Sequence, residues 1–157
     1  MREIKLFLDT EFTDFKSPKL ISFGLTSEEG NSFYAERLEG WSLGDCSAFV
    51  IQEVLPLLGP KMNRVNDARI RWCLREYAKS LGGRATIYTD SVWHDEPVFK
   101  SIFIDRMNEW PPEFNLEFLE FDSPAVVLFY DSHGLRRHHA LDDAIALKKA
   151  YVATRRP

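Results

Sequence analysis

The stretch RRHHALDDA, residues 136–144, places two histidines and two aspartates within nine residues of one another. In a helix, His139 and Asp143 would lie on the same face because four residues separate them. A histidine can accept a proton near neutral pH, which suits a general base. Asp142 and Asp143 also lie where a helix is expected to begin, and the helix dipole alone favours acids there. The pattern by itself leaves both roles open.

A second group of acids, Asp9 and Glu11, ends the apolar segment LFLDTEF, residues 6–12. Alternate residues of a β-strand point to the same face, so these carboxylates are expected roughly 6–7 Å apart along the strand. Two facing carboxylates repel each other unless solvent, a proton or a divalent metal ion compensates their charge. Their oxygen atoms suit Mg²⁺ or Mn²⁺. Two solvated acids at an exposed strand end are the alternative.

Two more aspartates follow the short β-rich segment ATIYT, residues 85–89. Asp95 lies where the chain leaves this strand and enters a helix, at the edge of an α/β sheet where ligand sites collect. Capping of that helix is the alternative role for Asp95. Asp90, directly at the strand's end, is the competing candidate for a catalytic carboxylate.

These motifs together resemble the DEDDh family of 3′–5′ exonucleases. The matching elements are DTEF from Asp9 to Phe12, an aspartate at the mouth of the middle helix, and H-x4-D within HHALDDA. The likeness is nearest to the small bacterial exoribonucleases of the ribonuclease T, oligoribonuclease and poly(A)-trimming kind. The middle motif departs from the family's HNxxFD, because this chain has DSVWHD from Asp90 to Asp95; the spacing matches Asp95 to the family's aspartate.

The resemblance implies a catalytic centre with two Mg²⁺ or Mn²⁺ ions. Asp9, Glu11, Asp95 and Asp143 would hold the ions, one of which activates the attacking water while the other stabilises the leaving oxygen. The family's histidine lies five residues before the last aspartate, in the loop ahead of the helix. This register selects His138 as the general base.

The same register assigns lesser roles to the neighbouring residues. His139 would lie at the edge of the substrate or on the exposed surface, and Arg137 would contact the nucleic-acid backbone. Phe12 would stack on the terminal base, with Thr10 beside it, although a core position is the alternative for Phe12. Asp142 would cap the helix or interact with its dipole.

The elements that must position these residues follow from the hydrophobic periodicity. Strands are expected over residues 4–9, 19–27, 31–36, 85–89 and 125–130, and helices over 47–58, 66–83, from Asp95 to Pro111, and over 139–154. The first three strands form an antiparallel meander. We therefore predict one α/β domain, residues 1–157, of the ribonuclease H-like type: a mixed five-stranded sheet with helices on both faces.

Composition narrows the class of protein. Of the 157 residues, 45% are hydrophobic and 28% are charged, which is typical of a soluble globular domain. No segment reaches the ~18 apolar residues of a membrane span, and the N-terminus is too charged for a secretory signal. Cys46 and Cys73 are expected to be buried free thiols in the reducing cytoplasm. The basic stretch 61–84 is interpreted as a solvated helix face.

The net charge of −4 argues against a protein that coats long nucleic acid, but it permits an enzyme that binds a few phosphates in one cleft. The predicted partner is single-stranded nucleic acid, with RNA favoured over DNA and no membrane; a homodimer stays open. A single-stranded DNA exonuclease and a ribonuclease H-like endonuclease are the enzyme alternatives. A binding or regulatory module that has lost catalysis is the alternative from another class.

Overall fold

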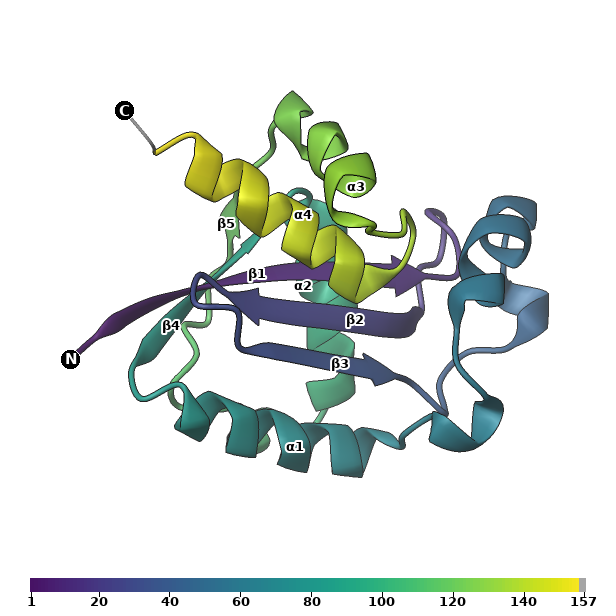
Figure 1. Cartoon of the computed structure of the whole chain (residues 1–157). Helices are drawn as coiled ribbons and strands as arrows, with labels where there is room; N and C mark the ends of the chain where they lie inside the picture. Colours follow the sequence, from purple (N-terminus) through teal and green to yellow (C-terminus); the bar gives the residue numbers. More distant parts are fainter. Residues whose placement is uncertain (156–157) are drawn as a thin grey trace.

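The computed structural model describes residues 1–155, so the last two residues of the predicted domain lie outside it. Its centre is a five-stranded sheet with the strand order β3-β2-β1-β4-β5 (Figure 1). The strands are β1 (Glu3–Phe12), β2 (Leu20–Ser27), β3 (Ser32–Glu36), β4 (Arg84–Thr89) and β5 (Leu119–Glu120). β1, β2 and β3 pair antiparallel, whereas β4 runs parallel to both β1 and β5. The predicted mixed sheet with a three-strand meander is confirmed.

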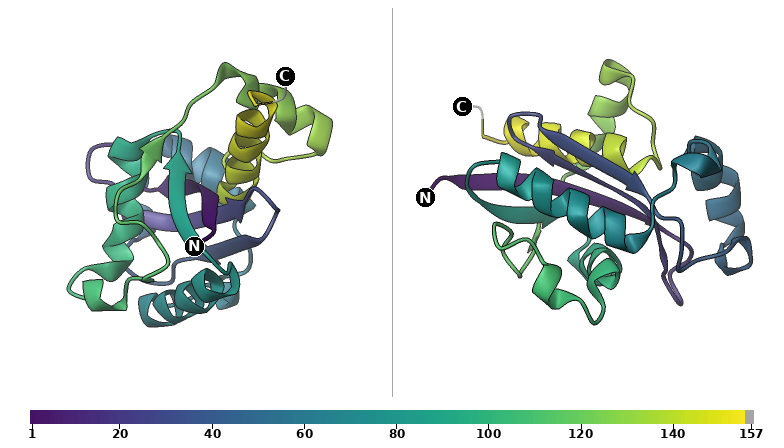
Figure 2. Two further views of the ribbon diagram at one scale, coloured as in Figure 1. Left: turned by 90° about the vertical axis from the view of Figure 1, so that its left-hand side faces the viewer. Right: turned by 90° about the horizontal axis from the view of Figure 1, so that it is seen from below.

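Helices cover both faces of the sheet (Figures 1 and 2). Helices α1 (Asp67–Ser80) and α2 (Val92–Lys100) pack on one face, and α4 (Ala140–Ala153) packs on the other against β1 and β2. A short helix, α3 (Leu128–His133), lies beside α4. α1 begins where its sequence predicted, because the side chain of Asn66 accepts a hydrogen bond from the backbone N–H of Arg69.

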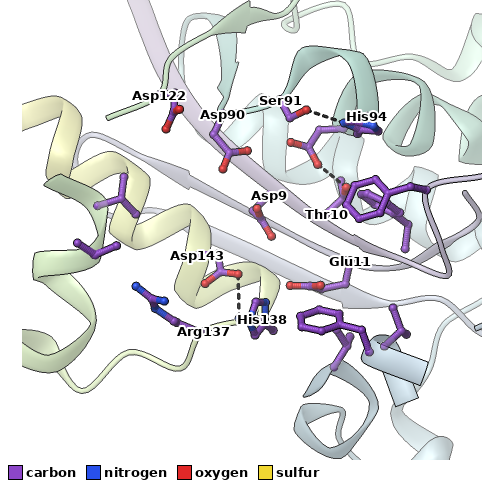
Figure 3. Close-up of a pocket in the computed structure, with 18 of the residues that line it drawn as sticks. Asp9, Thr10, Glu11, Asp90, Ser91, His94, Asp122, Arg137, His138 and Asp143 are labelled. Atoms are coloured by element: carbon purple, nitrogen blue, oxygen red, sulfur yellow. Dashed lines mark hydrogen bonds between the residues drawn. The ribbon is translucent and has the colours of Figure 1, made fainter. Parts of the chain in front are cut away.

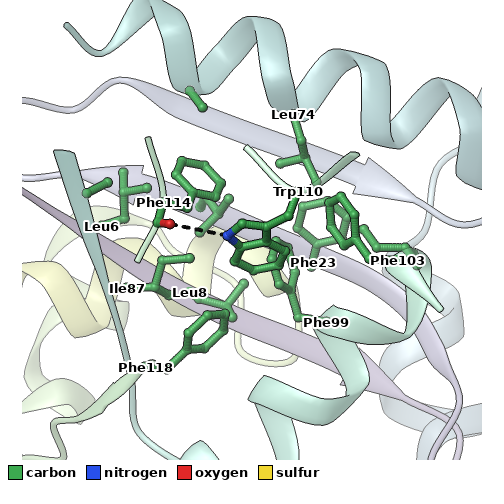
Figure 4. Packing of buried hydrophobic residues seen from close by; sticks show 14 of the residues in the cluster. Leu6, Leu8, Phe23, Leu74, Ile87, Phe99, Phe103, Trp110, Phe114 and Phe118 are labelled. Atoms are coloured by element: carbon green, nitrogen blue, oxygen red, sulfur yellow. Dashed lines mark hydrogen bonds between the residues drawn. The ribbon is translucent and has the colours of Figure 1, made fainter. Parts of the chain in front are cut away.

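The alternation of side chains along β1 places them in two different hydrophobic clusters. Leu6 and Leu8 face α1 and α2, within a cluster rich in aromatic side chains (Figure 4). Phe7 points the other way and packs against Leu147 and Tyr151 of α4. The aromatic cluster contains Phe23, Phe99, Phe103, Trp110, Phe114 and Phe118. Residues after Phe7 continue this alternation, which fixes the face that the acids of β1 take.

The predicted strand over residues 125–130 is wrong. These residues belong to a 3₁₀ turn, Pro124–Val127, and to α3, and the fifth strand is Leu119–Glu120 instead. Ser123 accepts a hydrogen bond from the N–H of Ala125 and Pro124 follows it, which together start a helix. Val127 and Leu128 are 51% and 68% exposed, so this apolar run lacks the cover on both faces that a buried strand needs.

Two predicted helices have different bounds. α2 begins three residues before Asp95, with Ser91 at its N-cap, so Pro97 lies inside the helix and not in its first turn. It ends at Lys100, and only 3₁₀ turns follow before Trp110. The segment 47–58 forms one π-helical and one 3₁₀ turn, Val50–Val54 and Leu55–Leu57.

Two expectations from composition have different outcomes. Cys46 and Cys73 are free, as expected, but both are only half-buried. No helix within residues 1–155 combines the length and the hydropathy of a membrane span.

Candidate active site

The end of β1 carries two acids to the face that α4 covers. Asp9 and Glu11 are separated by Thr10, so both lie on the same face as Phe7, as the sequence predicted. Thr10 points to the opposite face, toward α2. The strand therefore presents carboxylates to α4 and a hydroxyl to α2.

A glycine allows the last helix to reach these acids. Gly24 on β2 lies opposite Asp9 in the sheet. A Cβ atom at Gly24 would lie 2.3 Å from the Cα atom of Leu141 and 2.6 Å from its nitrogen. Any larger residue would push the first turn of α4 away from the sheet. The close approach brings Asp143 beside the end of β1.

A cavity of about 790 Å³ opens where β1 and β4 end (Figure 3). Its wall contains carboxylates from β1 and the loop that follows it, from the segment after β4, from α2, from the loop before α3 and from α4. They are Asp9, Glu11, Asp14, Asp90, Asp95, Asp122 and Asp143. The aromatic side chains of Phe12, Phe15 and Phe49 line the same cavity. The sequence predicted four of these acids, Asp9, Glu11, Asp95 and Asp143, and weighed Asp90 as the alternative to Asp95.

The acids form two groups that can each hold a cation. Ligand atoms of Glu11, His138 and Asp143 lie within 4.8 Å of one another, and so do those of Asp9, Asp90 and Asp95. Carboxylate oxygens are hard ligands that suit Mg²⁺ or Mn²⁺. The arrangement therefore fits two divalent ions at neighbouring positions.

Burial and mutual repulsion raise the pKa values of the acids. Burial, with Asp143 as the strongest neighbouring charge, raises the pKa of Asp9 well above its usual range and that of Glu11 to about 8. Burial likewise raises the pKa of Asp95 to about 7 and that of Asp143 to about 6. Protons that these acids retain near neutral pH would be displaced when a divalent ion binds.

Asp95 and Asp90 occupy different environments within one group. Asp95 is 3% exposed, and its two carboxylate oxygens accept hydrogen bonds from the hydroxyls of Thr10 and Thr89. Asp90 is exposed and lines the cavity from the end of β4. The structure thus brings both of the aspartates that the sequence weighed against each other to Asp9.

His138 lies in the loop just before α4, outside the helix. Its backbone has φ = 64°, in the left-handed region that residues other than glycine rarely adopt. Its N–H donates a 3.0 Å hydrogen bond to Oδ2 of Asp143, which ties this conformation to the acid. The ring packs edge-on against Phe49, with 5.0 Å between the ring centroids. The loop therefore directs the imidazole to Glu11 and Asp143.

Tyr130 is a residue of the site that the sequence did not identify. Its hydroxyl donates a 2.7 Å hydrogen bond to Oδ1 of Asp143, the oxygen that the backbone of His138 leaves free. The guanidinium of Arg137 lies 5.0 Å from the centre of the Tyr130 ring. Its position inside the run mistaken for a strand concealed Tyr130, because that run suggested apolar packing on both sides.

The predicted substrate-binding residues have different positions. Phe12 lines the cavity but also stacks on His94, with centroids 5.9 Å apart, and meets Phe15 edge-on. Arg137 is exposed at the cavity. Thr10 is 5% exposed, and its hydroxyl is engaged by Asp95. Phe12 and Arg137 thus remain accessible, whereas Thr10 supports an acid.

His139 is outside the acid cavity, although it adjoins His138. It is 8% exposed, stacks on Tyr34 with 4.7 Å between centroids, and forms the N-cap of α4 by accepting from the N–H of Asp142. Oδ2 of Asp142 accepts hydrogen bonds from the backbone N–H and the Nε–H of Arg136. The expectation that His139 lies on the exposed surface is therefore wrong, because the start of α4 and β3 enclose its ring.

Comparison with known proteins finds similarity in structure alone. The sequence matches no family model and no curated protein. A structure of exonuclease I, described as suggesting how processivity is achieved, matches with a TM-score of 0.60 and 16% identity over 99% of this chain and 42% of its own. E. coli exonuclease I in complex with a dT13 oligonucleotide matches with a TM-score of 0.52 and 15% identity. This match covers 98% of this chain and 40% of the exonuclease I chain.

The likeness establishes the fold. The chain spans about two fifths of the length of the exonuclease I chains that it matches. Its sheet and helices have the ribonuclease H-like arrangement of those structures, which confirms the predicted fold class.

Proposed function

We propose that this chain is a metal-dependent 3′–5′ exonuclease domain that releases nucleoside 5′-monophosphates from single-stranded nucleic acid. The observation that carries the proposal is the convergence of two acid groups on one cavity, with His138 held beside Asp143. The fold shared with exonuclease I supports it. The resemblance of DTEF and H-x4-D to the DEDDh family supports it from the sequence.

Each acid group would hold one of two ions. Glu11 and Asp143 would bind the first, and Asp9, Asp90 and Asp95 would bind the second. Divalent ions in such a site lower the pKa of bound water and offset charge on the leaving oxygen. Asp90 joins the predicted ligands because its carboxylate faces the cavity, while threonine hydroxyls orient the carboxylate of Asp95 behind it.

The residues of the chain would supply the proton transfer and the positioning. A ring nitrogen of His138 takes the proton of the attacking water, whose oxygen bonds to phosphorus while the bond from phosphorus to the 3′ oxygen breaks. Tyr130 holds Asp143 in place through its other oxygen. Arg137, exposed at the cavity, would contact a phosphate, and Phe12 would flank the terminal base.

His138 also belongs to one of the two ligand groups, so an alternative role as a metal ligand must be separated from that of a base. We assign the base role because Mg²⁺ and Mn²⁺ prefer oxygen ligands, and Glu11 and Asp143 already supply them. The measurement that separates the two roles is metal affinity, which a lost ligand lowers and a lost base does not.

RNA remains the predicted substrate, and single-stranded DNA is the second candidate. The preference for RNA comes from the resemblance to small exoribonucleases. DNA is favoured by the dT13 oligonucleotide that accompanies E. coli exonuclease I. Cytoplasmic location and a homodimer also stay predictions; sedimentation equilibrium would test the latter.

The deciding experiment is digestion of 5′-labelled RNA and DNA single strands of one sequence with Mg²⁺ or Mn²⁺. Stepwise shortening from the 3′ end, abolished by EDTA and blocked by a 3′-phosphate, is the expected result. A circular strand of the same sequence should stay intact. Internal cuts in the circle would favour the endonuclease, and binding without cleavage would favour the module that has lost catalysis.

A further inference from the structure

A second, smaller cavity of about 350 Å³ lies on the other side of the loop that carries His138. The loop residues are divided between the two cavities: Arg137 and His138 line the acid cavity, whereas Arg136 and His139, on either side of them in the sequence, line the smaller one. Its volume is within the range of small-molecule sites, about 300–1,000 Å³. The proposed nuclease chemistry does not use this cavity.

Glu36, at the end of β3, gives the small cavity an unsatisfied acceptor. Its Oε1 accepts hydrogen bonds from the hydroxyl of Tyr34 at 2.9 Å and from the N–H of Gly59 at 2.8 Å. Its Oε2 is buried and has no hydrogen-bond partner among residues 1–155, although Glu36 as a whole is 6% exposed. A buried carboxylate oxygen is costly unless a donor reaches it, so the cavity is suited to a ligand with an N–H or O–H group.

Arg136 gives the same cavity a cation. Its Nε donates to Asp142, while its two terminal nitrogens make no hydrogen bond within the described residues. The side chain is 53% exposed, so the free end of the guanidinium is accessible to an anion from solvent. Guanidinium groups bind phosphate through paired N–H donors.

The remaining walls offer apolar surface near these two groups. Ala35, Leu57 and Val65 contribute apolar atoms to the cavity. We propose that the cavity binds a nucleotide, with an N–H group of the base on Glu36 Oε2 and the phosphate on Arg136. The proposed function enters only in the choice of nucleotides as the ligand class; the donor and anion requirements come from the cavity itself.

Two substitutions test the carboxylate without removing its structural hydrogen bonds. Glu36→Gln keeps an oxygen for Tyr34 and Gly59 but replaces the free acceptor by an NH₂ donor. Gly59→Ala keeps Glu36 intact, and its Cβ would lie 3.6 Å and 3.9 Å from the two carboxylate oxygens, in ordinary contact with both. The added methyl would reduce the room for a ligand beside the carboxylate without displacing its neighbours.

The experiment is isothermal titration calorimetry of the full chain. It measures the affinities for AMP, CMP, GMP and UMP in a buffer that contains EDTA. Removal of metal takes away the cations that would hold a phosphate in the acid cavity, so binding there is suppressed. We expect the tightest of the four to lose about tenfold or more in affinity in Glu36→Gln and in Gly59→Ala. Asp9→Asn, in the other cavity, should bind this nucleotide as the wild type does.

Arg136→Gln tests the phosphate end. The wild type should bind the monophosphate about tenfold more tightly than the matching nucleoside, and Arg136→Gln should bind the two equally. If the nucleotide belongs to the substrate strand, Glu36→Gln should also weaken binding of a short oligonucleotide to the Asp9→Asn protein.

Three results would overturn the proposal. They are no binding of any monophosphate or oligonucleotide at millimolar concentration, binding that Glu36→Gln leaves within twofold, and equal affinity of the wild type for nucleotide and nucleoside. Melting curves of each variant confirm that it is folded. Because no step of the titration requires turnover, failure here is distinct from failure of the nuclease assay.

Discussion

The two faces of the sheet are built for opposite purposes. Between the sheet and helices α1 and α2, Leu8, Leu74 and Phe99 are fully buried, and the indole N–H of Trp110 donates to the carbonyl of Phe114. On the face that α4 covers, the same strand ends in carboxylates whose pKa values burial raises. The first face therefore stabilises the metal-free fold, whereas the acid end of the second face lowers its stability. The clustered carboxylates that lower the stability of the metal-free protein are the groups that would bind cations.

Removal of Asp9 should have the largest effect. Asp9→Ala should lower nuclease activity by at least about three orders of magnitude, because the second ion loses its ligand on β1. The same change should raise the melting temperature in EDTA, since it relieves repulsion among buried acids. Asp131→Ala, an exposed acid of α3 outside the cavity, is the control for both measurements.

Glu11→Ala should behave in the same way as Asp9→Ala. Full activity of either variant in Mg²⁺ would rule out the two-ion site. A lower melting temperature of metal-free Asp9→Ala would remove the contrast between the two faces.

Replacement of His138 should distinguish the role of the general base from that of the carboxylates, which bind the metal ions. His138→Ala should lower turnover by roughly two to four orders of magnitude, because the attacking water loses its proton acceptor. Affinity for Mn²⁺, followed by titration calorimetry, should change little, since histidine is not a ligand in this scheme. A large loss of metal affinity would instead make His138 a ligand.

On the opposite face, stability should change without chemistry. Leu74 is fully buried on α1, which carries none of the proposed site residues. Leu74→Ala should lower the free energy of unfolding by about 2–5 kcal/mol through lost burial and a residual cavity. Activity per folded molecule should stay at the wild-type level well below the melting temperature. A matched loss of activity would mean that the two faces are coupled.

The dependence of stability on pH should identify the acid face directly. Burial and the neighbouring carboxylates, Asp143 above all, raise the pKa of Glu11 to about 8 from an ordinary value of 4.5. The folded state therefore binds more protons than the unfolded state between these values, and stability falls as pH rises. In EDTA the free energy of unfolding should decrease by about 1–3 kcal/mol from pH 5 to pH 8.5. Mn²⁺ should reverse this trend, and Glu11→Gln should make the decrease smaller.

The features that the sequence predicted correctly are determined by residues close to one another in the chain. Alternation along a strand was sufficient to place Asp9 and Glu11 on one face, and an N-cap was sufficient to start α1 at Asn66. The meander and the mixed sheet needed only the order of strands and helices along the chain. The fifth strand, expected over residues 125–130, is Leu119–Glu120.

The parts that it missed depend on contacts between distant segments. Nothing local shows that Gly24 admits the first turn of α4, or that residues 128–133 form a helix from which Tyr130 reaches Asp143. The same applies to His139, whose enclosure comes from Tyr34 on β3. Apolar character in residues 125–130 was interpreted as burial, whereas much of it is exposed around the cavity.

The smallest expected effect concerns two adjacent acids of α4, Asp142 and Asp143. Asp142 accepts hydrogen bonds from Arg136, while Asp143 accepts from Tyr130 and His138. Asp142→Asn keeps an acceptor but loses the charge near the helix N-terminus, so it should cost a few tenths to ~1 kcal/mol of stability and little activity.

Asp143→Asn is the matched control, because it makes the same chemical change, carboxylate to amide, at the adjacent residue. It should lose activity, since an amide is a poor ligand for the ion that Glu11 shares. Chemical denaturation and the digestion assay, applied to both variants, measure the contrast. If Asp142→Asn and His139→Ala were the inactive variants instead, the register that selects His138 and Asp143 would be wrong by one residue. Chemistry would then have to be sought at the smaller cavity, on the side of the loop that His139 faces.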